Sequence, residues 1–187
     1  VLCTKFLGVM IDSALGWKQH ILYIKSKIAR GIGIIRKARQ VLGQKPLVTL
    51  YYSFIYPYFI YGLEVWGKAC ETYMKNLIVL QKRIVRMIAN LKPRDHTADI
   101  FINLEILTLP KLYIFKVFIF MHKFRNNMLP SIFQSLFCYN HSIHSYNTRQ
   151  ASAFRIPRTK SNILQKSICF TGVKVYNYYS NVIACSG

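Results

Sequence analysis

The sequence WKQHILYIKSKIARGIGIIRKARQVL (residues 17–42) indicates a helical fold class, because its isoleucines recur every three or four residues. This spacing places apolar side chains on one face of an α-helix. The stripe consists of Ile21, Ile24, Ile28, Ile32 and Ile35. Gly31 and Gly33 lower the helix propensity in the middle and favour a bend there. The stretch therefore predicts a long amphipathic helix whose apolar face needs partners.

The remaining surface of this predicted helix is basic. Three cations flank the apolar stripe on one side and three lie on the opposite face: Lys18, Lys25 and Arg36, then Lys27, Arg30 and Lys37. Lysines on solvated helices are usually matched by glutamates four residues away. Residues 17–42 contain no acidic residue at all. A surface that follows a phosphate backbone is therefore favoured over a merely solvated face.

Helical patterns continue downstream, and the predicted ranges are 46–56, 71–91, 98–104 and 110–127. Pro57 forces a break after the first of these, and Pro93 ends the second. The outer face of the helix at 71–91 carries four more basic side chains, Lys75, Lys82, Arg83 and Arg86. The helix at 110–127 is apolar nearly all round, which predicts a central, buried position.

The two ends of the chain differ from this helical middle. Residues 4–12 are predicted to form a tight strand, turn and strand, with Gly8 interrupting a run of strand-forming residues. Residues 143–157 and 167–179 show no clean period and are predicted to be loops and short strands. The fold class expected is mainly α: a helical bundle with a short N-terminal β-hairpin and an irregular α+β tail.

The charge balance of the chain points to a polyanionic partner. Its 187 residues include 26 Lys and Arg against 6 Asp and Glu, a formal net charge of +20. Nucleic acid is the commonest partner of such a chain, and an anionic membrane is the alternative. Residues 46–63 are uncharged but contain five tyrosines and Pro57, so a buried, kinked helical segment is favoured over a membrane span.

The five cysteines are widely spaced and include no C-x-x-C pair. This usage is typical of reduced thiols in an intracellular compartment, the nucleus or the cytoplasm. The beginning of the sequence shows no basic region followed by an apolar run, so no signal peptide is expected there.

Residues suited to catalysis or metal binding are scarce. Two-metal phosphoryl transfer needs clustered carboxylates that hold ions roughly 4 Å apart, and the closest aspartates, Asp95 and Asp99, are better explained as acids at a helix N-terminus. Cys138, His141 and His144 resemble half of a zinc site without a local fourth ligand. His20, His96 and His122 stand alone and are interpreted as ordinary surface or helix histidines. No catalytic residue and no metal ligand is predicted.

Several blocks of the sequence resemble the reverse transcriptases of non-LTR retrotransposons of the jockey-like, LINE type. The first is Lys5-Phe6-Leu7-Gly8-Val9 with Asp12, followed by the W-x-x-H-I start of the helix at Trp17. Further similar blocks occur in order at 50–67, 80–88, 104–109, 120–123, 129–133, 144–149 and 156–157. The end departs from the family pattern, because Thr171-Gly172-Val173 stands where R-G-P is usual and Tyr176-Asn177 where W-N is usual.

The resemblance implies a division of the chain into three parts. Residues 1–14 would be a primer-grip hairpin with Lys5, Phe6, Leu7 and Gly8, residues 15–95 a helical thumb, and residues 96–187 a C-terminal extension, helical to about residue 138. The implied partners are RNA template, DNA primer or duplex, and the missing palm and fingers region, and no membrane is implied. The catalytic palm, its aromatic-Ala-Asp-Asp hairpin and its Mg²⁺ belong to the full-length family enzyme, and no such motif occurs in this sequence. No cofactor and no polymerase activity are therefore expected of this chain alone.

Two other interpretations share some of these features. A stand-alone nucleic-acid-binding module derived from a mobile element would carry the same basic surface. A membrane-associated protein would use residues 46–63, although their tyrosines disfavour it.

Overall fold

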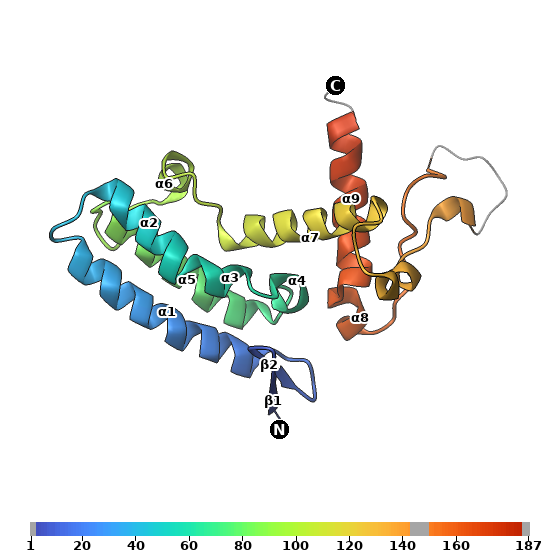
Figure 1. Ribbon diagram of the computed structural model, residues 1–187, viewed down its shortest axis with the longest axis horizontal. Coiled ribbons are helices and arrows are strands. Elements are labelled where there is room, and N and C mark those ends of the chain that lie inside the picture. Colours follow the sequence, from blue (N-terminus) through green and yellow to red (C-terminus); the bar gives the residue numbers. More distant parts are fainter. Residues whose placement is uncertain (1–2, 143–149, 185–187) are drawn as a thin grey trace. The chain divides into compact units, whose positions relative to one another are not determined.

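The computed structural model describes residues 3–142 and 150–184. The chain divides into two compact units, Val1–Tyr113 and Ile114–Gly187, which are described separately below. Helices predominate in both, and a short β-hairpin opens the first (Figure 1). The expected mainly α fold with an N-terminal hairpin is confirmed.

The hairpin consists of strands β1 (Cys3–Phe6) and β2 (Val9–Asp12). They pair antiparallel, with Cys3 opposite Asp12 and Phe6 opposite Val9. Leu7 and Gly8 form the turn with φ angles of 44° and 85°. Positive φ at both central residues is the geometry whose twist matches that of two paired strands. The hairpin predicted for residues 4–12 is thus confirmed, and β2 lies against the first helix.

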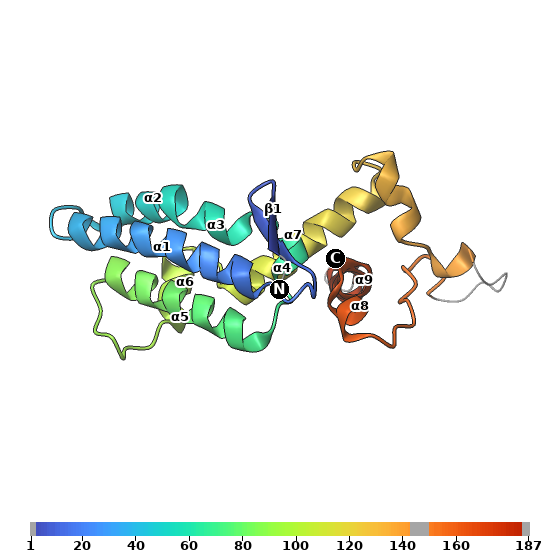
Figure 2. The same ribbon diagram turned by 90° about the horizontal axis from the view of Figure 1, so that it is seen from below.

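Three helices form the main body of the first unit: α1 (Lys18–Ala38), α2 (Gln44–Phe54) and α5 (Glu71–Ile88). Helix α1 packs against both α2 and α5, and Figure 2 shows it running between them. The predicted isoleucine stripe of α1 is buried at every position. The helix continues through both of its glycines. At Gly31 an added Cβ would lie 2.8 Å from Ile55 Cγ1, so this glycine permits the close approach of the following helical segment.

The apolar segment at 46–63 folds into short helices inside this unit. Helix α2 ends before Ile55, and α3 (Tyr56–Ile60) and α4 (Leu63–Trp66) follow it. The predicted break is confirmed, and Pro57 lies in the first turn of α3, where a missing N–H costs no hydrogen bond. Ile55, Phe59 and Trp66 are completely buried. Among the described helices, none is long and apolar enough to cross a membrane.

Two more helices follow α5, namely α6 (Ala98–Asn103) and α7 (Leu109–Arg125). The expectation that α7 would be buried all round is wrong. Its buried positions form one stripe, whereas Phe115 is 49% exposed. The apolar residues on the remaining surface of α7 are mostly half-buried. Aromatic and branched side chains therefore give α7 a high hydropathy without placing it at the centre of a core.

The described residues of the second unit comprise the rest of α7 from Ile114, two 3₁₀ turns, η1 (Ser131–Leu136) and η2 (Asn140–Ser142), and helices α8 (Asn162–Lys166) and α9 (Ile168–Ala184). The prediction of loops and short strands at 167–179 is wrong, because α9 begins at Ile168 and covers the rest of this range. The core of the second unit is formed by Met121, Phe137, Phe154, Val173 and Tyr176. Burial of Gly172, Val173 and Tyr176 recurs at helical spacing, so packing outweighs the low helix propensity of β-branched and aromatic residues. Within the described part of 143–157, Phe154 makes one isolated bridge to Tyr139.

Candidate nucleic-acid interface

Asp12 fixes the connection between the hairpin and α1. Its carboxylate accepts hydrogen bonds from the backbone N–H groups of Ala14, Gly16 and Trp17 at 3.1, 2.9 and 2.9 Å. The side chain is 6% exposed. Trp17 precedes the helix in the left-handed conformation, with φ of 63°. Asp12 therefore positions the first turn of α1 beside β2, and its oxygens are occupied by backbone donors.

His20 joins that first turn to the hairpin. Its Nδ1 accepts a hydrogen bond from the Met10 N–H at 3.3 Å, and its ring meets the Trp66 ring edge-on at 5.4 Å. Burial lowers the pKa of His20 to about 4. The neutral ring consequently carries its proton on Nε2, which is buried and has no hydrogen-bond partner among the described residues. His20 lies in a helix as expected, but it is buried at the junction of three segments rather than on the surface.

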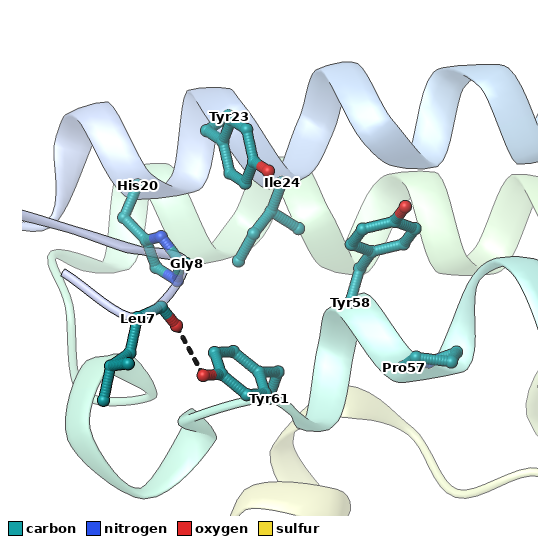
Figure 3. Close-up of a pocket in the computed structure, with 8 residues that line it drawn as sticks. All are labelled: Leu7, Gly8, His20, Tyr23, Ile24, Pro57, Tyr58 and Tyr61. Carbon is teal, nitrogen blue, oxygen red and sulfur yellow. Dashed lines mark hydrogen bonds between the residues drawn. The ribbon is translucent and has the colours of Figure 1, made fainter. Parts of the chain in front are cut away.

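The four residues expected to form the primer grip lie at the hairpin turn. Lys5 is exposed, and Phe6 and Leu7 are 63% and 73% exposed. The Tyr61 hydroxyl donates a hydrogen bond to the Leu7 carbonyl, as Figure 3 shows. This contact holds the turn against the residues that connect α3 and α4. The turn therefore presents large apolar side chains outward from a fixed backbone.

A pocket of about 270 Å³ opens behind this turn. Its lining comes from the hairpin turn, the first turns of α1 and the α3 region (Figure 3): Leu7, Gly8, His20, Tyr23, Ile24, Pro57, Tyr58 and Tyr61. Tyr23 also meets two cations, since Lys5 Nζ and Lys27 Nζ lie 5.5 and 5.3 Å from its ring centroid. Ammonium groups over an aromatic face are attracted by its negative charge density. Tyr23 thus draws a lysine of the hairpin and a lysine of α1 together.

Most of the basic side chains predicted to bind nucleic acid are exposed. The exposed ones are Lys18, Lys25, Arg30, Arg36, Lys37, Lys75, Lys82 and Arg83. Lys75 pairs with Glu71 at 3.0 Å. Lys27 and Arg86 are half-buried, and Arg86 Nε donates to the Asp95 carbonyl at 2.8 Å. Arg86 is therefore committed to holding the turn after α5, which leaves α1 as the element richest in uncommitted cations.

The carboxylates and possible metal ligands of the described residues are dispersed. Asp95 Oδ2 accepts from the Lys92 N–H at 2.9 Å, and Asp99 lies in the first turn of α6. The helix-terminus interpretation is thus confirmed for Asp99, whereas Asp95 caps the preceding turn. Among the described residues, no three His, Cys, Asp or Glu side chains gather to hold a metal ion. His144, part of the half zinc site considered above, lies outside them.

Gln81, which the sequence motifs did not single out, is a buried polar residue at the centre of hydrogen bonds in the first unit. Its Nε2 donates to Tyr51 Oη at 3.1 Å and to the Leu107 carbonyl at 2.9 Å, and its Oε1 accepts from the Leu109 N–H at 2.8 Å. Burial raises the pKa of the Tyr51 hydroxyl. The sequence does contain a signal for this role. Gln81 interrupts the apolar stripe of α5 between Leu77 and Ile84, where a polar side chain requires buried hydrogen-bond partners.

Comparisons with known proteins identify related sequences. The RNA-directed DNA polymerase of the mobile element jockey from Drosophila melanogaster is 32% identical over 113 residues, which covers 58% of this chain and 12% of the relative. The probable RNA-directed DNA polymerases of the D. melanogaster transposons X-element and BS are each 28% identical, over 88 and 92 residues. These cover 45% and 46% of this chain.

The matched part of the chain spans only about a tenth of the length of each of these curated relatives. No protein-family model and no solved structure matches it. Over about half of its length the chain is thus similar to the RNA-directed DNA polymerases of jockey-like mobile elements, which confirms the resemblance indicated by its sequence motifs.

Proposed function

We propose that this chain is the thumb-like and C-terminal part of a retrotransposon RNA-directed DNA polymerase, and that it binds template–primer nucleic acid through α1 and α5. The observation that carries the proposal is the surface of α1. Five of its six predicted basic side chains are exposed, and the helix contains no acidic residue to neutralise them. The similarity to polymerases supports nucleic acid as the polyanion.

Recognition in this proposal depends on phosphates and duplex shape. Lys and Arg contacts to the backbone position a protein on a duplex without reading its sequence. A-form RNA duplexes in particular are recognised by shape and by backbone contacts. We therefore expect similar affinity for RNA–DNA hybrids of different sequence and a strong dependence on salt.

Catalysis in this proposal requires residues outside the chain. The matched segments cover only 10% and 12% of two relatives, so a palm with metal-binding carboxylates has room elsewhere in such a protein. Within the described residues, Asp12 and Asp95 accept backbone hydrogen bonds and Glu71 pairs with Lys75. Purified chain should not extend a primer in Mg²⁺, and DNA synthesis that co-purifies with the chain would contradict this part of the proposal.

The binding claim is tested by the salt dependence of affinity for a fluorescent RNA–DNA hybrid. Each neutralised phosphate contributes about 0.7–0.9 to the slope of log affinity against log salt. Replacing Lys18, Lys25 and Arg36 by Ala should therefore reduce the slope by about 2.

A matched control removes the same charge elsewhere. Lys45, Lys92 and Arg94 are also exposed but lie outside α1 and α5. Their triple replacement by Ala should change the slope by less than half as much. Equal effects of the two triple variants would show that net charge alone, and not the surface of α1, carries the binding.

A further inference from the structure

The second unit, Ile114–Gly187, has an extreme charge composition. It contains nine Lys and Arg and no Asp or Glu. All six acidic residues of the chain precede residue 106. No carboxylate side chain within this unit can neutralise its cations, so its surface attracts polyanions independently of α1 and α5.

The cations of this unit lie at its surface. Seven are exposed in the described residues: Lys123, Arg125, Arg155, Arg158, Lys160, Lys166 and Lys174. Three of them follow one another within 155–160, a segment with no helix or strand of its own. These three exposed cations lie close together in the sequence, on a surface that a phosphate backbone can approach.

A column of stacked rings runs from the core of the same unit to its surface. The Phe154 and Tyr139 rings are nearly parallel, with centroids 4.6 Å apart and an interplanar angle of 21°. His141 stacks on Tyr139 at 5.3 Å and 17°. Phe154 is 2% exposed, whereas His141 is exposed. The column therefore ends in a flat ring that solvent reaches.

Backbone hydrogen bonds hold this column in place. The His141 N–H donates to the Ala151 carbonyl at 3.1 Å, and the Arg155 N–H donates to the Cys138 carbonyl at 2.9 Å. The His141 ring lies 3.0 Å from the Ala151 carbonyl through Nδ1, which must donate because a carbonyl only accepts. The terminal ring is thus fixed in orientation before any ligand binds.

A cation lies beside the column. Arg125 Nη1 donates to the Tyr176 hydroxyl at 3.4 Å, and the Tyr176 ring packs against Phe154 with centroids 5.5 Å apart. The hydrogen bond to Tyr176 raises the pKa of Arg125, and the nearby Tyr139 hydroxyl adds to the effect. Rings and cations that could meet bases and phosphates are therefore close together.

We propose that Ile114–Gly187 carries a second nucleic-acid site, specific for single strands, in which a base stacks on His141 and phosphates meet Arg125, Arg155, Arg158 and Lys160. Aromatic rings beside a basic surface are the features by which proteins bind single strands without reading sequence. Inside a duplex the bases are paired and stacked on one another, so their faces are not free to stack on the terminal ring. The site consists of residues of the second unit only, and it does not depend on the function proposed for α1.

The test measures binding of the full chain to a fluorescent oligothymidine and to an abasic strand of equal length. Replacing His141 by Ala should weaken oligothymidine binding by about tenfold, within the range expected for one stacked base. Abasic binding should not change, and His141→Phe should restore the affinity because it keeps the ring. The control is His122→Ala, another exposed histidine, which should bind normally.

The phosphate contacts are tested through salt. Replacing Arg155, Arg158 and Lys160 by Ala should lower the salt slope for oligothymidine by about 2, since each single-strand phosphate contributes about 0.7. In the variant that lacks Lys18, Lys25 and Arg36, His141→Ala should still weaken oligothymidine binding, whether or not this variant binds the RNA–DNA hybrid. This result distinguishes an error in the single-strand site from an error in the function proposed for α1.

Three results would overturn the proposal. The first is unchanged affinity of His141→Ala for oligothymidine. The second is an equal loss on the abasic strand, which would mean that no base is stacked. The third is that the 155–160 variant loses binding to phosphatidylserine vesicles and keeps binding to oligothymidine, which would assign the basic segment to a membrane surface.

Discussion

Each unit uses one amide side chain of a helix to hold an irregular segment. In the first unit Gln81 of α5 bonds both the Leu107 carbonyl and the Leu109 N–H. In the second, Asn177 of α9 donates to the Phe154 carbonyl at 2.7 Å and accepts from the Phe154 N–H at 3.2 Å. The two amides make the same kind of paired contact, but Gln81 is completely buried and Asn177 is half-buried.

This difference in burial predicts a difference in energetic weight. Loss of a buried partner leaves polar groups without water, whereas loss at a half-buried site lets water replace part of the contact. Gln81 also bonds Tyr51 and so connects α5 to α2. The surroundings differ too, since isoleucines dominate the core of the first unit and aromatic rings that of the second. Substitutions of Gln81 and Asn177 measure how far burial alone sets the contribution of each amide to the free energy of unfolding.

The largest effect is expected for Gln81→Leu. The substitution preserves volume but leaves the Leu107 carbonyl, the Leu109 N–H and the Tyr51 hydroxyl without partners. We expect the free energy of unfolding to fall by about 3 kcal/mol, measured by urea denaturation. Gln19→Leu, at an exposed position of α1, is the matched control and should change it by less than 0.5 kcal/mol, about the limit for surface sites. Equal effects of the two variants would refute the buried role.

A smaller effect is expected for Asn177→Ala, about 1.5 kcal/mol. The substitution removes both bonds to Phe154, so amide hydrogen exchange should accelerate at Phe154 before it does in α5. Asn181 lies on the same helix and is exposed, and Asn181→Ala should leave the exchange unchanged. A loss of stability as large as that of Gln81→Leu would contradict this expectation, because burial would then not distinguish the two amides.

His20 offers a third test, in which pH replaces mutation. Its pKa falls from 6.5 to about 4 on folding, so between these values the unfolded chain binds a proton that the folded chain does not. Its contribution to stability is complete above pH 6.5 and is lost as the pH falls toward 4. We expect a slope of about 1 kcal/mol per pH unit in this window.

The assignment of that slope to His20 is checked by His20→Phe, which keeps a ring but cannot titrate. The variant should flatten the pH dependence of the free energy of unfolding, measured by denaturant titration at several pH values. His122→Phe, at an exposed position, should retain the wild-type profile. A steep profile in His20→Phe would assign the effect to another group.

The sequence predicted most of the first unit because its periodic signals are local. The isoleucine stripe, the turn at Gly8 and the break before Pro57 each depend on neighbours in the chain, and each is confirmed. Helix α9 was missed for the opposite reason. Its helix-forming tendency is low, and its stability comes from Val173 and Tyr176 packing against residues far away in sequence, such as Phe154.

The candidate site was predictable in its charges but not in its contacts. Exposure of Lys18 and Arg36 follows from their place beside the apolar stripe. The burial of His20 does not, because it depends on β2 and Trp66 enclosing the first turn of α1. The contact of Arg86 could not be predicted from the sequence either, since only the fold reveals that its Nε donates to the Asp95 carbonyl. Tyr176-Asn177, where the sequence departs from the pattern that it otherwise resembles, nevertheless supplies a buried ring and the amide that bonds the Phe154 carbonyl.

The close contact at Gly31 has a consequence for how freely the sequence of α1 can change. Gly31 and Gly33 are two residues apart and look equivalent, yet an added Cβ meets Ile55 at the first and nothing within 4 Å at the second. Alanine at 33 would gain helix propensity, up to about 1 kcal/mol, whereas alanine at 31 must push neighbouring side chains apart. Across diverging copies of this chain, position 33 should accept many residues while position 31 remains glycine.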